Sequence, residues 1–322
     1  MIKGTYIFYE DGLEIYRSEN VITKFGKRFL TNYLAGNTQF AEKDIAIGIA
    51  TDTEYPISAS NSRLGFEFYR LPVNYGGIDI RQNPGVVDED GNPGFLYSVI
   101  YKTTIPQDVA GIINEIGLYP GKRTSDNNYD SKFLTDFENN TVWFDSSGYN
   151  PQIVSTNNPR IGSYLIKSST SAGNTTKEYK TSINSLDISG YSVYDSITLA
   201  FNQADANLSS IKIRFYSSDA SYFESTFTTT STTGNKIQSN ILNSMLASPI
   251  NNPDPTSISK IGIIIASGSG GAATVYLDGL RINDEDTFDP TYGMISRSTL
   301  STALSKLAGR QVDIEYRLDL SL

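Results

Sequence analysis

Apolar and polar residues alternate strictly near the C-terminal end of the chain, over residues 311–320. Successive side chains of a β-strand point to opposite faces of a sheet, so this alternation predicts an amphipathic strand. Its apolar face holds Val312, Ile314, Tyr316, Leu318 and Leu320. Such a face needs a sheet or a partner to cover it, so we expect the strand to be essential to its domain.

The N-terminal third has the pattern of a sheet with one helix. Residues 4–9 and 13–17 favour strands and flank a turn at 10–12, which predicts a hairpin. Apolar residues recur at helical spacing over residues 23–35, and Gly36 stands where a helix usually ends. Further apolar runs predict strands at residues 44–50, 65–71, 78–81, 95–104 and 111–119.

The middle of the chain is rich in Ser, Thr and Asn, and its apolar runs are short. They predict strands at residues 141–144, 162–168, 185–188, 196–201, 210–216, 222–228, 259–266 and 273–282. A short helix is predicted at residues 239–246. Many short strands separated by turns indicate a β-sandwich.

Residues 297–308 show a second helical pattern, with Leu300, Ala303, Leu304 and Leu307 on one face. A lone helix and strand cannot form a domain, so we expect residues 286–322 to return to the N-terminal sheet. The predicted architecture is mainly β: a discontinuous base domain, residues 1–133 and 286–322, with two short helices. A polar linker begins at residue 121, and the base domain carries an inserted module at residues 134–285.

The amino-acid composition limits the catalytic and metal-binding groups that the chain can use. The chain of 322 residues has a formal net charge of −9 and contains no His and no Cys. Disulfides, Cys/His zinc sites and Cys-His or Ser-His-Asp catalysis are therefore excluded, and any metal site needs oxygen ligands, as calcium or magnesium sites do. An acidic chain is a poor ligand for nucleic acid or anionic membrane, and we expect no membrane insertion. We also find no signal-peptide pattern.

Three stretches of the predicted module carry a family resemblance: 134–145 (LTDFENNTVWFD), 186–201 (LDISGYSVYDSITLAF) with 211–224, and 259–282, which ends in YLDGLRI. They resemble carbohydrate-binding modules of the jelly-roll, galactose-binding-like type. The resemblance implies a structural calcium that joins the first and last strands, with ligands among Asp136, Glu138 and Asp278. The alternative is that Glu138 and Asp278 only accept hydrogen bonds at strand ends.

The same resemblance implies sugar binding on exposed aromatic faces. The candidate side chains are Trp143, Tyr149, Tyr191, Tyr216, Tyr222 and Phe223. Trp143, Tyr216 and Phe223 could equally belong to the core, because every second side chain of a strand is buried. Tyr149 and Tyr191 stand beside glycines, which favours exposure.

Four stretches of the predicted base domain carry a second resemblance: NVITKFG at residues 20–26, IAIG at 45–48, NEIGLY at 114–119 and EYRL at 315–318. They resemble virion proteins of tailed bacteriophages. It implies a structural component of the tail, baseplate, fibre or neck, assembled in the host cytoplasm with other virion proteins as a homo-oligomer.

Three hypotheses follow. The first is a phage structural protein, not an enzyme, whose module attaches to a host-surface glycan. The second is a decoration or spacer protein whose module binds no ligand. The third is a polysaccharide-acting enzyme that uses carboxylates, such as Asp136 with Glu138 or the acids at 284–286, which would have to face each other across a cleft.

Overall fold

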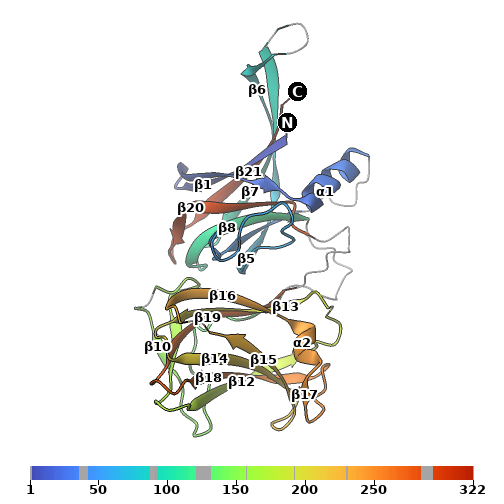
Figure 1. Cartoon of the computed structure of the whole chain (residues 1–322). Helices are drawn as coiled ribbons and strands as arrows, with labels where there is room; N and C mark the ends of the chain where they lie inside the picture. Colours follow the sequence, from blue (N-terminus) through green and yellow to red (C-terminus); the bar gives the residue numbers. More distant parts are fainter. Residues whose placement is uncertain are drawn as a thin grey trace. The chain divides into compact units, whose positions relative to one another are not determined.

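The computed structural model describes residues 2–35, 43–87, 91, 93–120, 132–156, 158–191, 193–229, 231–283 and 293–321 (Figure 1). The protein is mainly β, as predicted, and all its strand pairs are antiparallel within this part of the chain. Its contacts divide it into two units. The first is Met1–Ser125 with Thr287–Leu322, and the second is Asp126–Asp286. None of the described helices is long and apolar enough to cross a membrane.

The first unit contains two five-stranded sheets. One runs in the order β2 (Leu13–Glu19), β1 (Ile2–Glu10), β21 (Val312–Ser321), β7 (Pro93–Ile105) and β6 (Asn74–Val87). The other runs in the order β3 (Val21–Ile22), β20 (Ser296–Lys306), β8 (Gly111–Pro120), β4 (Lys43–Gly48) and β5 (Glu67–Pro72). Tyr6 on β1 and Ser296 on β20 share a buried hydrogen bond of 2.7 Å that links the two sheets.

The first hairpin and the first helix form where the sequence predicts them. Asp11 and Gly12 turn the chain between β1 and β2 with φ angles of 51° and 78°. Helix α1 spans Lys24–Leu34, and the Thr23 hydroxyl accepts the N–H of Gly26 at 2.9 Å, which caps its first turn. Gly36, the loop at 88–90, the stretch 121–131 and the acids at 284–286 lie outside the described residues.

The C-terminal strand lies at the centre of its sheet, between β1 and β7. Its predicted apolar face is confirmed at Val312, Ile314 and Tyr316, which are all buried; Leu318 is half-buried, and the side chain of Leu320 lies outside the described part of the structure. The opposite face is not simply solvated, since Glu315 is also buried and pairs with Arg317 and Lys102. This strand therefore holds together two segments that lie far apart in the sequence.

The helix predicted at residues 297–308 is wrong, because this segment is strand β20. It pairs with β8 from Ser296 opposite Leu118 to Lys306 opposite Gly111. The register shifts between Thr299 and Leu304, and this irregular stretch contains Leu300, Ala303 and Leu304, three of the four apolar positions that suggested a helix. Ser and Thr residues favour helices little, so the pairing with β8 outweighs the local pattern.

The second unit is a β-sandwich, which confirms the predicted jelly-roll class of fold. One sheet runs in the order β10 (Gln152–Val154), β11 (Leu165–Ser169), β19 (Thr274–Asn283), β13 (Ser196–Gln203) and β16 (Gly234–Ile241), and β9 (Lys132–Thr135) also pairs with β19. The other runs in the order β12 (Thr176–Leu186), β18 (Ile258–Ser267), β14 (Leu208–Tyr216), β15 (Tyr222–Thr228) and β17 (Pro249–Ile250).

Two local predictions for this unit need correction. The predicted helix at residues 239–246 begins later, as α2 (Leu242–Leu246), because Ser239, Asn240 and Ile241 still pair with β13. The predicted strand at residues 141–144 is a turn that makes one isolated bridge, between Phe144 and Lys180. Asn and Asp side chains accept nearby backbone N–H groups here, which stabilises a turn in place of a strand.

Candidate functional site

The outer face of the sheet β12–β18–β14–β15–β17 combines aromatic and charged side chains. Strand β14 alternates over residues 211–215: Ile211, Ile213 and Phe215 are buried in the core of the sandwich, while Lys212 and Arg214 between them are half-buried on the other face. The strand registers place Arg214 opposite Gly262 on one side and Glu224 on the other. The face is therefore built from side chains of adjacent strands.

Two tyrosines form the aromatic part of this face. Tyr216 and Tyr222 are paired across β14 and β15, with their ring centroids 5.1 Å apart. Gly262 makes room for the first ring, because a Cβ at this position would lie 2.7 Å from Cε2 of Tyr216. Tyr216 is almost fully buried. The Nζ of Lys180 lies 4.3 Å from its ring centroid.

A network of charged hydrogen bonds fixes these groups. The Tyr216 hydroxyl donates to Glu178 and accepts from Nη1 of Arg214 at 3.3 Å. Nε of Arg214 donates to Oε2 of Glu224 at 2.7 Å, and Nζ of Lys212 donates to Oε1 of the same carboxylate at 2.7 Å. Each charged group on β14 thus holds a partner on a neighbouring strand.

A groove of about 550 Å³ lies beside this network. It is lined on the one hand by the turn that contains Val142, Phe144 and Asp145, and on the other by residues of β12 that include Glu178 and Lys180. The turn is held against β12 by two backbone hydrogen bonds of 3.0 and 2.8 Å between Phe144 and Lys180. Val142 and Phe144 are 47% and 46% exposed, so the wall presents apolar surface to a ligand.

The electrostatics favour hydrogen bonding over proton transfer. Burial alone would raise the pKa of Glu224, but the hydrogen bonds from Lys212 and Arg214 outweigh it and hold that pKa below its usual value. Burial raises the pKa of Tyr216, and its bond to Glu178 raises it further. At neutral pH, Glu224 is therefore an ionised acceptor and Tyr216 a protonated donor.

The structure separates the predicted aromatic residues into three groups. Trp143, Tyr191 and Phe223 belong to the core, where Trp143 packs on Phe137 with a centroid distance of 5.4 Å. None of these three rings offers an open face to a sugar. Tyr216 and Tyr222 lie on the outer face described above, whereas Tyr149 is 70% exposed and does not line the groove.

The predicted calcium ligands hold a loop by its backbone. Glu138 accepts the N–H groups of Ser163 and Tyr164 at 2.8–3.0 Å, and Asp278 accepts those of Arg160 and Ile161 at 3.0 and 3.1 Å. The third candidate, Asp136, accepts the N–H of Glu138 at 3.1 Å. The backbone N–H groups therefore occupy the carboxylate oxygens that would have to bind a cation.

The residues around Asp278 also do not fit a calcium site. The Arg160 guanidinium lies 4.0 Å from Asp278, and its positive charge would repel a cation. No group of three or more acidic side chains that could hold a metal converges within the described residues. Calcium favours six to eight oxygen ligands, so the hydrogen-bonding alternative describes this arrangement better.

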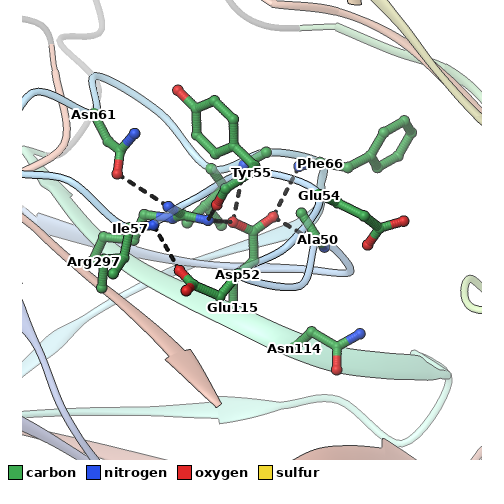
Figure 2. A network of polar contacts seen from close by, with 12 residues as sticks. Ala50, Asp52, Glu54, Tyr55, Ile57, Asn61, Phe66, Asn114, Glu115 and Arg297 are labelled. Atoms are coloured by element: carbon green, nitrogen blue, oxygen red, sulfur yellow. Dashed lines mark hydrogen bonds and ion pairs between the residues drawn. The ribbon is translucent and has the colours of Figure 1, made fainter. Parts of the chain in front are cut away.

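A second charged cluster lies inside the first unit (Figure 2). Glu115 and Arg297 are fully buried and form an ion pair of 2.9 Å between Oε2 and Nη2. Glu115 also accepts the N–H groups of Ala50, Gly65 and Phe66, at 2.8–3.3 Å. The guanidinium donates to the carbonyls of residues 55 and 56 and to Asn61. Every bond serves to fix the irregular segment 49–66, so this cluster is structural.

Two motifs of the phage resemblance, NEIGLY and IAIG, meet at this cluster. Glu115 belongs to the NEIGLY stretch, whose Asn114 donates to the carbonyl of Ile49 at 2.9 Å. Gly48 ends the IAIG stretch, and a Cβ there would lie 2.5 Å from the Glu115 carboxylate. A Cβ at Gly26 would lie 2.0 Å from the carbonyl oxygen of Ile295. These motif residues therefore have packing roles in the first unit.

Sequence reasoning missed most of the charged groups of the outer face. Lys212 and Arg214 alternate with apolar residues in IKIRFY, and Glu224 follows two aromatic residues in the next strand. The alternation shows which side chains leave the core. It does not show that strands β12 and β14 are both neighbours of β18, which brings Glu178 to Tyr216.

Comparisons with known proteins give distant structural likenesses only. No protein-family model matches the chain, and no curated protein matches its sequence. One similar structure is the family 11 carbohydrate-binding module from Clostridium thermocellum in complex with a β-1,3-1,4-mixed-linked tetrasaccharide. It is 16% identical, with a TM-score of 0.35, over 49% of this chain and 97% of that chain. Another is the family 30 module of a cellulosomal cellulase of the same bacterium, with 12% identity and a TM-score of 0.36, over 49% of this chain and 99% of that one.

Proposed function

We propose that the second unit binds a carbohydrate in the groove beside β12. The observation that carries this proposal is the groove itself, where the exposed Phe144 stands next to a fixed set of charged donors and acceptors. Small-molecule sites combine apolar walls with a few well-placed polar groups in the same way.

The chemistry of the lining suits a sugar. Sugar hydroxyls both donate and accept hydrogen bonds, and Glu178 accepts while Lys180 and Lys260 donate. The C–H surface of a sugar ring can pack on Phe144, as aromatic rings favour such apolar contact. Since the Tyr216 hydroxyl and Arg214 hold Glu178 in place, this carboxylate of the lining is preorganised for a ligand.

The proposed activity is binding without turnover. A glycosidase needs one carboxyl group with a raised pKa to protonate the leaving oxygen. Two carboxyl groups line the groove: the N–H groups of Tyr149 and Ser147 lower the pKa of Asp145, and Glu178 accepts the Tyr216 hydroxyl and lies 3.6 Å from Arg214. Both acids are therefore better suited to hold hydroxyl groups than to transfer protons.

For the first unit we propose a role as the base that anchors the chain in a tailed-phage particle, where it contacts other virion proteins. The support is the resemblance of its sequence stretches, which lie in β3 and α1, β4, β8 and β21; those on β4 and β8 meet at the buried Glu115–Arg297 pair. The module would then present its groove for attachment to the host surface.

The test is a glycan array with the full chain, followed by calorimetric titration of any glycan that binds. Phe144→Ala should weaken binding at least about 10-fold, because it removes the apolar wall at an exposed position. Tyr164→Ala is the matched control, since Tyr164 is 45% exposed and does not line the groove. Hydrolysis of a bound glycan would favour the enzyme hypothesis. A flat array would favour the decoration or spacer hypothesis.

A further inference from the structure

Strand β6 is the terminal strand of its sheet and is 14 residues long. With β7 it forms a hairpin that runs past the other strands of the first unit (Figure 1). Within the described part of the chain, no strand pairs with the outer side of β6. A long free edge of this kind presents backbone N–H and C=O groups to which another strand can bind.

The side chains on one face of this hairpin are apolar and exposed. Ile78 and Ile80 are 62% and 58% exposed, and Phe95 on β7 is 48% exposed. The registers place Ile78 opposite Val99, Ile80 opposite Tyr97, and Val99 opposite Leu318 of β21. The same face continues along β21 to Tyr316, which is fully buried. The core face of the sheet thus extends onto the hairpin, where it is uncovered.

The other face of β6 carries two charged residues that flank Ile80 in the sequence: Asp79 before it and Arg81 after it. Nε of Arg81 donates to Oδ2 of Asp79 at 2.6 Å, and Nη1 of Arg317 lies 3.2 Å from the same oxygen. The Arg81 and Asp79 side chains are 54% and 32% exposed, so both can reach a neighbouring strand. A two-fold axis through Ile80 would place Asp79 of one copy opposite Arg81 of a second copy, so the charges of the two strands are complementary.

We infer that two copies of this chain pair through their β6 strands, antiparallel and centred on Ile80. In this register each Asp79 lies opposite Arg81 of the other copy, and the two Ile80 side chains are neighbours on the apolar face. The pairing joins two five-stranded sheets into one continuous sheet. It is an isologous contact, the usual form of a two-fold homodimer.

The charges select this register over its neighbours. A pairing centred on Asp79 puts two aspartates opposite each other, and one centred on Arg81 puts two arginines opposite each other, which is unfavourable. A slip by a single residue brings Asp79 opposite Ile80 and mixes the apolar and charged faces. Pro84 lacks an N–H group, so the paired region ends close to it.

A single cysteine tests the geometry, because the chain has none of its own. Directly opposite residues of an antiparallel pair have Cα atoms about 4.5–5.5 Å apart, which is within the range of a disulfide. The full chain with Ile80→Cys should therefore form a disulfide-linked dimer on oxidation, and reduction should break this link. Ile78→Cys is the matched control: its copy lies four residues along the strand, about 13 Å away, so it should form no covalent dimer on oxidation.

Sedimentation equilibrium tests the contact without a cross-link. The full chain should dimerise, and Arg81→Asp or Asp79→Arg should each raise the dissociation constant at least about 10-fold, because like charges then face each other. The double variant Asp79→Arg with Arg81→Asp should recover most of the affinity. A chain that is monomeric at every concentration, as it would be if β6 bound a different protein, overturns the inference. Equal cross-linking at positions 78 and 80 also overturns it.

Discussion

Burial and hydrogen bonding compete over the carboxylate of Asp278. Both its oxygens accept backbone N–H groups from residues 160 and 161, yet its side chain is almost completely enclosed. Burial raises the pKa of Asp278 to about 7, against the opposing effects of Arg160 and of the two N–H donors. The folded protein therefore keeps this proton at pH values where the unfolded chain has released it.

This difference makes the second unit less stable as the pH rises from about 4 to about 7. Over that window the unfolded chain binds fewer protons than the folded one, so deprotonation favours unfolding. We expect the melting temperature to fall between pH 5 and pH 8, and Asp278→Asn to reduce this fall, as measured by calorimetry. Asp187→Asn is the control: bonds from Ser189 lower the pKa of Asp187, so it stays ionised throughout. An unchanged pH dependence in Asp278→Asn would contradict the argument.

The bonds of Glu138 and Asp278 also give an expectation for calcium. Because their oxygens already accept N–H groups from residues 160–164, millimolar calcium and excess chelator should give the same melting temperature for the second unit. A ligand that binds only the folded state raises the melting temperature, and the shift grows with the logarithm of its concentration relative to its dissociation constant. A clear upward shift with calcium, lost with chelator and absent in Asp278→Asn, would restore the calcium hypothesis.

The Glu115–Arg297 pair should be the most sensitive charged contact in the first unit. Removal of one partner of a buried pair leaves the other charge uncompensated, which costs about 3–5 kcal/mol. Arg297→Met and Glu115→Gln should each lower the stability of this unit by that order in chemical denaturation, and the double variant should lose less than the sum. Glu14→Gln breaks an exposed pair with Arg17 and should change little. Wild-type stability in Arg297→Met would refute the structural role.

At the scale of elements, the sequence predicts correctly the helices and strands whose apolar pattern agrees with the turn or cap residues at their ends. The hairpin β1–β2 has a turn of the right chemistry, and α1 has both an apolar face and the cap at Thr23. Strand β20 has a helical spacing of leucines, but it must bring Arg297 to Glu115 and pair with β8. Local spacing carries no information about a partner that lies more than a hundred residues away, so this element was predicted wrongly.

The candidate site, too, could be predicted from the sequence only in part. The aromatic residues were visible in the sequence, and Tyr216 and Tyr222 do lie on one face. Their exposure was not visible, because Trp143 and Tyr191 follow turns and yet fill the core. The groove depends on the turn at 141–146 lying against β12, a contact between segments that no periodicity connects.

Strand β21 is the element on which the first sheet depends, since it pairs with β1 and β7 at once. Ile314→Asp should lower the stability of the first unit by more than about 3 kcal/mol, because an unpaired charge would be buried among apolar side chains. Glu315→Lys should lower it by about 1–3 kcal/mol, since Glu315 is buried and binds Arg317 and Lys102. Thermal melting checks this order.

The control for these variants is Gln311→Ala, at an exposed position just before the strand. It should melt like the wild type. A chain shortened after residue 310 should lose the transition of the first unit altogether. If that chain instead melts normally, then β21 does not belong to the core of the sheet.

At the scale of the whole molecule, the chain leaves each unit close to where it returns. In the second unit Lys132 pairs with Ile282, so the first and last strands of the module are neighbours. In the first unit Ser296 pairs with Leu118, and the N–H of Ile295 donates to the carbonyl of Leu118 at 2.7 Å. Neither unit therefore needs the other to bring its chain ends together.

This geometry predicts that the first unit folds without the module. A chain in which a short Gly/Ser linker joins Pro120 directly to Gly293 should stay soluble, because loop closure over a few residues costs little when the ends are already adjacent. We expect a β-type circular dichroism spectrum and one cooperative melting transition, close to one of the two transitions of the full chain. The matched control carries Ile314→Asp in the shortened chain and should not fold, since it disrupts the sheet and leaves the join intact. An insoluble or unfolded shortened chain would mean that contacts with the module are part of the stability of the first unit.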